Sequence, residues 1–167
     1  EGLGALLFTV DGMAGPGRST AVGGLGDGLV ERGRDVVFTG EPGGRELGNS
    51  LRAMLLDAGN SDIAPKAELF LYLADRAQHA ASVVKPALER GAIVLSDRYF
   101  DSTIVYQGYG RGLDVEELLS LNTIAVDGTW PDVTLLFDVV PETGLGRAGG
   151  GNTGGGKSVS EGRVEGG

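Results

Sequence analysis

The sequence predicts an α/β protein built in three layers, in which a parallel sheet is flanked by helices on both faces. Four short apolar runs have the length and composition of buried parallel strands, and long segments that can form helices separate them. The predicted strands are Ala5–Val10, Val36–Thr39, Ala92–Ser96 and Val133–Phe137. At 167 residues, 41% of them apolar, the chain is long enough for one domain with one core.

Aspartates mark the ends of three of these strands: Asp11, Asp97 and Asp138. Ligands of open parallel sheets collect at the carboxyl ends of the strands. We therefore expect a polar binding site along this edge of the sheet.

The first strand leads into a glycine-rich loop of the form G-x-x-x-x-G-R-S. Glycines allow successive backbone N–H groups to curl around a polyphosphate, and the following helix presents its positive N-terminus to the same anion. A basic side chain then reaches the β- and γ-phosphates, and the next hydroxyl can bind Mg²⁺. Arg18 stands where lysine is usual. The expected phosphate-binding residues are Gly12, Met13, Ala14, Gly15, Pro16, Gly17, Arg18, Ser19 and Thr20.

The helix expected after this loop is the weakest of the predicted elements. It contains four glycines, each of which costs about 1 kcal/mol of helix preference relative to alanine. We expect Leu25, Leu29 and Val30 to hold this helix by packing.

A turn of sequence EPGG at 41–44 follows the second strand, and its proline and glycines predict a rigid conformation. The segment Lys66–Val84 is the clearest helix, because its apolar residues recur on one face. Pro65 suits the first turn of this helix, and Pro86 is expected to kink or restart it.

Two pairs of polar residues carry candidate chemistry. Tyr72 and Arg76 are four apart and therefore share a helix face, although a core tyrosine beside a solvated arginine is an equally plain interpretation. Asp97 and Arg98 follow the third strand, where a planar guanidinium is suited to bidentate phosphate binding. In the alternative, Asp97 caps the next turn and pairs with Arg98.

The segment after the third strand carries Thr103, Tyr106 and Gln107, whose hydroxyl and amide groups suit recognition of a pyrimidine edge. A helix start capped by Asp101 or Ser102 is compatible with this function.

Composition excludes several classes of function. The net charge of −9 argues against a surface that coats nucleic acid. The absence of cysteine excludes disulfides, thiolate metal sites and thiol catalysis, and it fits a cytoplasmic protein. No membrane span or signal peptide is expected. We assign no general-base role to His79, the only histidine.

Glycine dominates the last part of the chain, so two units are expected: a core at 1–143 and a glycine-rich lid and C-terminal segment at 144–167.

Taken in order, the glycine loop, EPGG at 41–44, DRY at 97–99 and YQG at 106–108 resemble the thymidylate kinase family of P-loop nucleoside monophosphate kinases. The likeness runs from roughly residue 5 to residue 147, and the ordered set is more specific than the loop alone. It implies a P-loop NTPase-like fold, a homodimer, and transfer of the γ-phosphoryl group of ATP to dTMP with Mg²⁺, a step of dTTP biosynthesis. Neither nucleic acid nor a membrane is expected as a partner.

The resemblance implies roles around the acceptor phosphate. Arg52 and Arg98 would contact that phosphate, Asp97 would organise Mg²⁺ with Ser19, and Asp11 would lie near the sugar 3′-hydroxyl and the metal.

It also implies a thymine site. Tyr72 would stack on the base, Arg76 would hydrogen-bond its edge together with Thr103 and Gln107, and Tyr106 would favour deoxyribose.

The lid would supply charge in the transition state, because positions 13–16 carry no basic residue. Arg147 would take this role, with Lys157 or Arg163 as further candidates. The candidate catalytic residues are Arg18, Asp11, Arg98 and Arg147.

Two other functions stay open from the sequence. A related deoxynucleoside kinase would not need two arginines at an acceptor phosphate, so Arg52 and Arg98 argue against it. A non-catalytic nucleotide-binding module with a degenerate loop is favoured by Arg18, which is bulkier than lysine, and by Pro16, which lacks a backbone donor.

Overall fold

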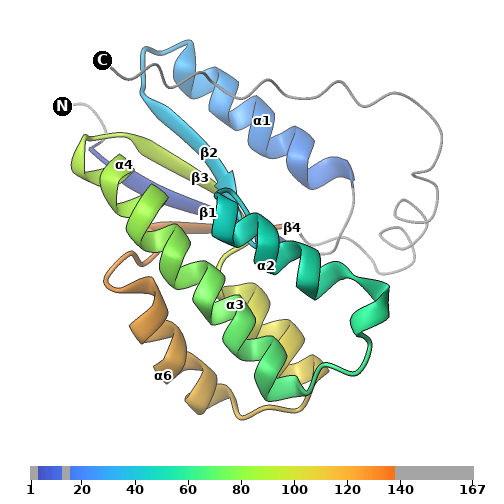
Figure 1. Cartoon of the computed structure of the whole chain (residues 1–167). Coiled ribbons are helices and arrows are strands. Elements are labelled where there is room, and N and C mark those ends of the chain that lie inside the picture. Colours follow the sequence, from blue (N-terminus) through green and yellow to red (C-terminus); the bar gives the residue numbers. More distant parts are fainter. Residues whose placement is uncertain (1–3, 13–15, 138–167) are drawn as a thin grey trace.

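The computed structural model describes residues 4–12 and 16–137, and it has the predicted α/β architecture (Figure 1). Four parallel strands form one sheet in the order β2-β3-β1-β4. They are β1 (Leu6–Gly12), β2 (Val36–Gly40), β3 (Ile93–Asp97) and β4 (Val133–Phe137), and they confirm the four predicted strands. The expected lid at 144–167 and Asp138 lie outside the described residues.

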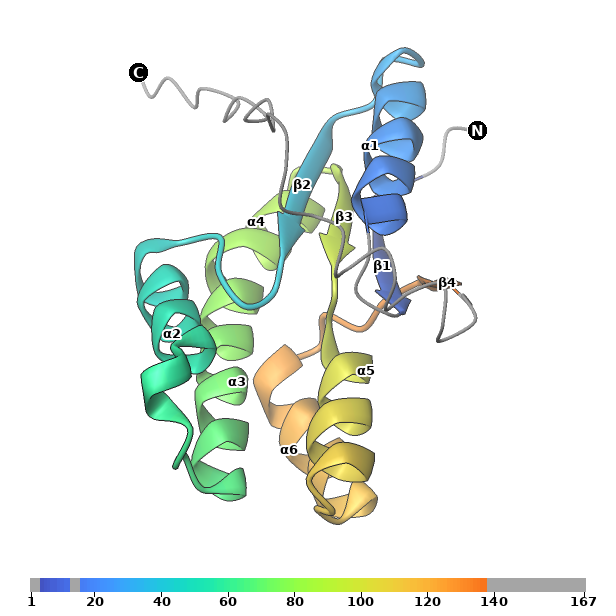
Figure 2. The same ribbon diagram turned by 90° about the vertical axis from the view of Figure 1, so that its right-hand side faces the viewer.

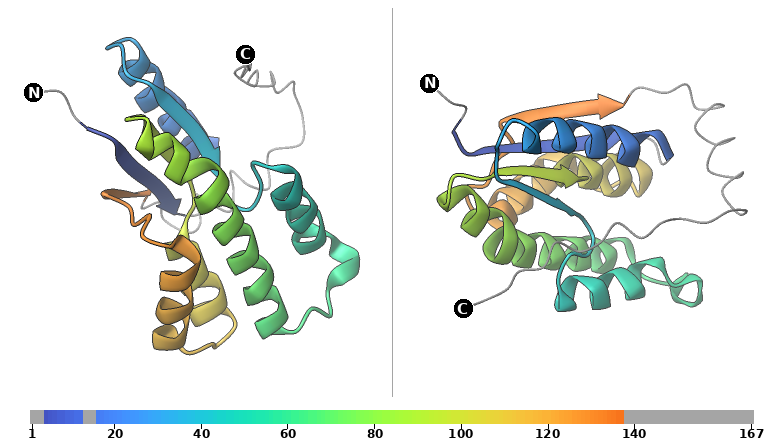
Figure 3. Two further views of the ribbon diagram at one scale, coloured as in Figure 1. Left: turned by 60° about the vertical axis from the view of Figure 1, so that its left-hand side comes forward. Right: turned by 90° about the horizontal axis from the view of Figure 1, so that it is seen from above.

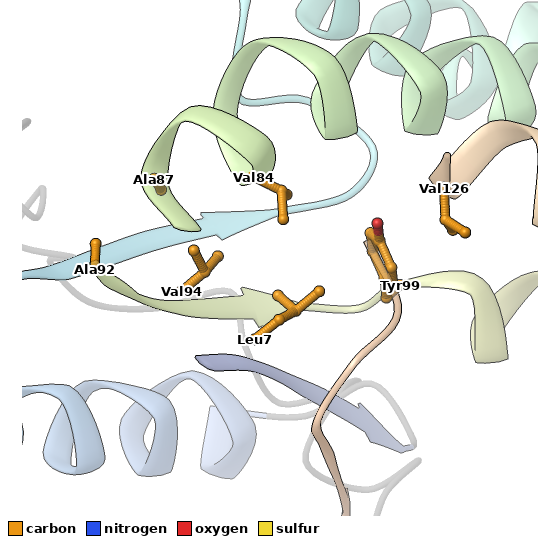
Figure 4. Close-up of a cluster of buried hydrophobic side chains, with 7 residues drawn as sticks. All are labelled: Leu7, Val84, Ala87, Ala92, Val94, Tyr99 and Val126. Atoms are coloured by element: carbon orange, nitrogen blue, oxygen red, sulfur yellow. The ribbon is translucent and has the colours of Figure 1, made fainter. Parts of the chain in front are cut away.

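Helices cover both faces of this sheet, as predicted. The helix α1 (Pro16–Val30) lies along one face, and α4 (Lys85–Glu89) packs against the other (Figure 2). Side chains of a strand point alternately to the two faces, so β3 contributes Ile93 and Leu95 to the core beneath α1 and Val94 to the core beneath α4. Figure 4 shows the second of these cores.

A group of helices extends beyond the carboxyl ends of the strands (Figure 3). It comprises α2 (Glu46–Leu56), α3 (Pro65–His79), the short α5 (Phe100–Thr103) with the π-helical turn η3 (Ile104–Gly110), and α6 (Val115–Val126). Leu69 and Leu73 of α3 pack on Leu118 and Ala125 of α6 and hold this group together. None of the helices described is both long enough and apolar enough to cross a membrane.

The predicted helix Lys66–Val84 is confirmed as α3 followed by the π-helical turn η2 (Ala80–Val84). Pro65 occupies its first turn, as expected. The expected restart is seen at Pro86, which lies in the first turn of α4, and α4 continues directly from η2. In an α-helix residue 86 would donate to the carbonyl of Ser82, and here the guanidinium of Arg45 donates to that carbonyl instead (3.3 Å).

The prediction for α1 was only partly right. Leu29 packs on the core together with the buried Val22, but Leu25 and Val30 are exposed, so they do not hold the helix. α1 approaches the sheet closely at Gly26, where a Cβ would lie 1.9 Å from the ring of Phe38.

Gly48 of α2 is packed too closely to accept a side chain. A Cβ there would lie 2.7 Å from the carbonyl oxygen of Gly43 and 2.6 Å from Oδ1 of Asp75. We expect Gly48→Ala to lower the free energy of unfolding by about 1–3 kcal/mol, because the backbone of the neighbouring turn must move. Urea denaturation measures the change.

The matched control is Gly23→Ala in α1, where a Cβ would meet nothing within 4 Å. This change should raise the free energy of unfolding by up to about 1 kcal/mol through helix preference alone. Equal effects of the two substitutions would contradict the packing argument.

Candidate functional site

Two adjoining hollows lie where the strands of the sheet end and the helical group begins. The first has a volume of about 250 Å³ and the second about 360 Å³. The first is lined by Glu41, Pro42, Arg52, Leu56, Tyr72, Arg76, Arg98, Tyr99, Ser102, Thr103, Tyr106 and Gln107. The second is lined by Gly40, Glu41, Pro42, Gly43, Gly44, Asn49, Arg52, Asp97 and Arg98. The predicted site at the carboxyl ends of the strands is therefore a two-part cavity.

Arg52 and Arg98 line both hollows. Arg52 projects from α2 and uses one N–H to donate to the carbonyl of Pro42 (2.9 Å). Arg98 follows β3 with a left-handed backbone (φ 73°), and its N–H donates to the carbonyl of Val10 (2.9 Å). A residue other than glycine rarely adopts this conformation, and such strain is concentrated at functional sites.

The side chain of Arg98 lies between a carboxylate and an aromatic ring. Its Nη1 donates to Ser102 Oγ (3.2 Å) and to the Tyr106 hydroxyl (3.3 Å), and its guanidinium lies 5.3 Å from the centre of the Tyr106 ring. The same Nη1 is 3.8 Å from Asp11 Oδ1. The partner of Arg98 is thus Asp11, and not Asp97 as the alternative interpretation of the sequence had it.

Asp11 is nearly buried at the end of β1, where its Oδ1 accepts from Ser102 Oγ (2.7 Å). Its Oδ2 is buried and has no hydrogen-bond partner among the residues described. Ser102 therefore lies within α5 as a donor to Asp11, and it does not cap the helix. Asp97, the last residue of β3, lines the second hollow.

The phosphate loop is only partly described. Gly12 ends β1 with φ +134°, and a Cβ there would lie 2.5 Å from the carbonyl oxygen of Phe137, so both conformation and space require glycine. The first turn of α1 contains Pro16, Gly17 and Arg18, and the exposed Ser19 and Thr20 follow. Met13, Ala14, Gly15 and Arg147 lie outside the described residues.

The floor of the first hollow is a buried arginine. Arg76 donates through Nε to Glu41 (2.8 Å), through Nη1 to Thr103 Oγ1 (2.7 Å) and Asn122 Oδ1 (2.6 Å), and through Nη2 to the carbonyl of Tyr99 (3.1 Å). Its side chain is 2% exposed, so it is not the solvated arginine of the plain interpretation. It lines the hollow on the same face of α3 as Tyr72, as the spacing predicts.

The turn at 41–44 is held from α3 by two further side chains. Glu41 Oε1 accepts from His79 Nδ1 (2.8 Å), whose Nε2 lies 2.6 Å from the hydroxyl of Thr39. Asp75 Oδ1 accepts from the backbone N–H of Gly43 (3.2 Å). Burial, and secondarily the charge of Glu41, raises the pKa of Asp75 to about 6. His79 thus supports the turn at 41–44, and no sequence pattern indicated the role of Asp75.

The remaining predicted residues also line the first hollow. Tyr72 is half-buried, and burial raises the pKa of its hydroxyl. Gln107 is buried and donates through Nε2 to Glu68 (2.8 Å), while Tyr106 is more exposed. Seven of the eight residues predicted for dTMP line this hollow, and Asp11 reaches it through Ser102. The part of the chain that the structure describes holds no cluster of three or more candidate metal ligands.

The comparisons with known proteins agree with one another. A family model described as thymidylate kinase matches residues 10–161. A thymidylate kinase of Nitratidesulfovibrio vulgaris (strain DSM 19637 / Miyazaki F) is 58% identical over 160 residues, covering 96% of this chain and 74% of the relative. The enzyme of Halothermothrix orenii is 48% identical over 143 residues, covering 86% and 69%. The crystal structure of thymidylate kinase from Ehrlichia chaffeensis matches with a TM-score of 0.77 at 36% identity, covering 87% and 82%.

The raised pKa of Asp75 predicts a pH dependence of stability. An unfolded aspartate titrates near 3.8, whereas the folded carboxyl stays protonated up to about pH 6. As the pH rises from about 4 to about 6, the unfolded state loses this proton first, and the native state is destabilised relative to it by up to about 3 kcal/mol. Asp75→Asn keeps the carbonyl that accepts from Gly43 and does not titrate. We therefore expect the free energy of unfolding of Asp75→Asn to rise relative to that of the wild type as the pH increases from about 4 to about 6.

Urea denaturation at pH 4, 5, 6 and 7 measures the difference. Asp62→Asn, at an exposed position, serves as the control and should follow the wild-type profile. Parallel profiles for wild type and Asp75→Asn would show that Asp75 titrates in the folded protein as it does in the unfolded chain.

Proposed function

The chain belongs to the thymidylate kinase family, and we propose that the two hollows bind dTMP, the phosphate acceptor. The protein is an enzyme that transfers the γ-phosphoryl group of ATP to dTMP and forms dTDP. One observation carries the placement of the acceptor: two arginines line both a hollow with aromatic walls and a polar hollow beside it. A nucleoside monophosphate has this form, with a planar base at one end and an anion at the other.

The two alternative functions are not favoured. Relatives that are 54–58% identical carry the name thymidylate kinase, and none of them is named as a deoxynucleoside kinase or a binding module. The second arginine in the polar hollow would also have no purpose for a nucleoside without a phosphate.

The acceptor phosphate is proposed to lie between Arg52 and Arg98. A guanidinium binds phosphate oxygens through parallel N–H groups, and such charge-assisted hydrogen bonds are about twice as strong as neutral ones. The protein carries a net charge of −9, so binding of an anion depends on these local cations. Asp11 and Tyr106 fix the direction of the Arg98 guanidinium.

The thymine base is proposed to occupy the first hollow, stacked on the ring of Tyr72. Arg76, Thr103 and Gln107 would face its edge, and Tyr106 would lie near the deoxyribose. Arg76 already donates four hydrogen bonds to protein groups. A hydrogen bond to the base would be made in addition to these four.

The phosphates of ATP are proposed to bind the loop at 12–20, where the N-terminus of α1 provides a positive field. Phosphoryl transfer depends on positioning and on electrostatic stabilisation of the equatorial oxygens, so no general base is needed. We assign this stabilisation to Arg18, Arg98 and Arg147, with Asp11 orienting Arg98 beside the acceptor.

The donor set suits Mg²⁺. Ser19 offers a hydroxyl oxygen and Asp97 a carboxylate oxygen, and Mg²⁺ prefers few protein oxygens together with waters and substrate phosphates. When bound, the ion would neutralise charge on the transferring phosphates.

A homodimer in the cytoplasm is also proposed. The helical group exposes large apolar side chains, among them Leu47 and Met54 of α2, Phe70 of α3 and Ile124 of α6, and such surfaces are typical of protein interfaces. Light scattering coupled to size exclusion tests the dimer.

The function is tested by a coupled assay of ADP release with dTMP, dUMP and thymidine as acceptors. We expect turnover with dTMP and none with thymidine, which has no phosphate for Arg52 and Arg98. Binding of dTMP without turnover would favour the non-catalytic module, and turnover of thymidine would favour the deoxynucleoside kinase.

Arg52→Leu should separate acceptor binding from donor binding. Loss of a charged hydrogen bond costs about 1.5–3 kcal/mol, so we expect the KM for dTMP to rise about 10- to 100-fold while the KM for ATP changes by less than about twofold. Arg90→Leu is the control, because Arg90 pairs with Asp35 away from both hollows (2.9 Å). A rise in both KM values would argue against an acceptor-specific role of Arg52.

A further inference from the structure

Gln107 lies in the wall of the first hollow with its amide held from behind. Its Nε2 donates to Oε1 of Glu68 (2.8 Å), and its side chain is 3% exposed. An ionised carboxylate can only accept, so the NH₂ group of Gln107 must face Glu68. The carbonyl oxygen Oε1 of Gln107 accepts no hydrogen bond from any residue that the structure describes. It is therefore left to accept from a ligand in the hollow.

Glu68 is itself fixed by Arg111. Nη2 of Arg111 donates to Oε2 of Glu68 (2.7 Å) and Nε donates to Oε1 (3.3 Å). The hydrogen bond from Arg111, and then that from Gln107, lowers the pKa of Glu68, so this carboxylate stays ionised at neutral pH. Neither Glu68 nor Arg111 lines the hollow. Their hydrogen-bonded connection to the hollow runs through Gln107.

The hydroxyl group of Thr103 is oriented as a hydrogen-bond donor, in contrast to the accepting carbonyl of Gln107. Its Oγ1 accepts from Nη1 of Arg76 (2.7 Å), and an arginine cannot accept in return. The hydroxyl hydrogen of Thr103 is thus free to donate. Thr103 and Gln107 are four residues apart on one helical segment, so a donor and an acceptor stand one turn apart at the hollow.

We propose that Glu68 is a positioning residue that determines base specificity: by holding the NH₂ group of Gln107, it presents the Gln107 carbonyl to the ring N3–H of a 2,4-dioxopyrimidine. Thymine offers a donor at N3 and an acceptor at O4, which match Gln107 Oε1 and the Thr103 hydroxyl. Cytosine offers an acceptor at N3 and a donor at the 4-amino group, so both contacts would be mismatched. The inference rests on the proposed placement of the base in the first hollow.

Glu68→Gln tests this role, because a glutamine at 68 can donate as well as accept and therefore allows the amide of Gln107 to turn over. We expect the ratio of kcat/KM for dTMP to kcat/KM for dCMP to fall by about tenfold or more, through both a loss with dTMP and a gain with dCMP. The KM for ATP should be unchanged. A merely structural role of Glu68 would lower both activities and would leave the ratio unchanged.

Two further variants complete the experiment. Glu116→Gln is the matched control, because Glu116 lies in the first turn of α6 as Glu68 lies in the first turn of α3. It should keep the wild-type ratio. Arg111→Leu removes the side chain that fixes Glu68 but leaves the Glu68 carboxylate, so we expect a smaller fall of the ratio, of about two- to fivefold.

The outcomes are distinct. An unchanged ratio in Glu68→Gln would overturn the inference, and so would an unchanged ratio in Arg111→Leu, which tests the same arrangement even if Glu68→Gln does not fold. Failure of the wild type to phosphorylate dTMP would instead overturn the proposed function.

Discussion

The buried ion pair between Arg76 and Glu41 is the interaction on which the rest of the site depends. Each side chain is 2–3% exposed, and burying an unpaired charge would cost several kcal/mol. The pair therefore requires the turn at 41–44 to stay against α3. Because the same guanidinium also bonds Thr103, Asn122 and the Tyr99 carbonyl, one side chain fixes the relative positions of four segments that are distant in the sequence.

The arginines of the site differ in how many of their N–H groups the protein itself engages. Arg76 is surrounded by protein acceptors, whereas Arg52 and Arg98 face the hollows with only part of their donors engaged. Buried carboxyl groups lie near these arginines. Glu41 and Asp75 lie behind the turn, next to Arg76, and Asp11 lies beside Arg98. An acidic protein can thus hold an anionic substrate, because two of its arginines, Arg52 and Arg98, converge where the strands end.

Sequence patterns that depend on neighbours along the chain were sufficient for the strands and for the helix after Pro65, and the family resemblance anticipated seven of the residues that line the first hollow. These patterns could not predict which residues distant in the sequence contact each other. Arg76 could be placed on a helix face, but its burial depends on Glu41, 35 residues away. Ser102 was expected as a cap, and its actual partner is Asp11. The prediction for α1 was partly wrong because Val22 and Leu29 face the sheet while Leu25 and Val30 face away from it, and Gly26 lies against Phe38.

The bond from the Arg98 N–H to the Val10 carbonyl has a geometric consequence. It ties the end of β3, which leads to Arg98, the proposed acceptor arginine, to the end of β1, which leads into the loop proposed to bind ATP. Adjacent parallel strands are about 4.8 Å apart, and backbone hydrogen bonding sets this spacing whatever the side chains are. The main chain of the sheet therefore sets the lateral distance between the proposed donor and acceptor sites. Side-chain substitutions change how tightly each nucleotide is held, but they leave that distance unaltered.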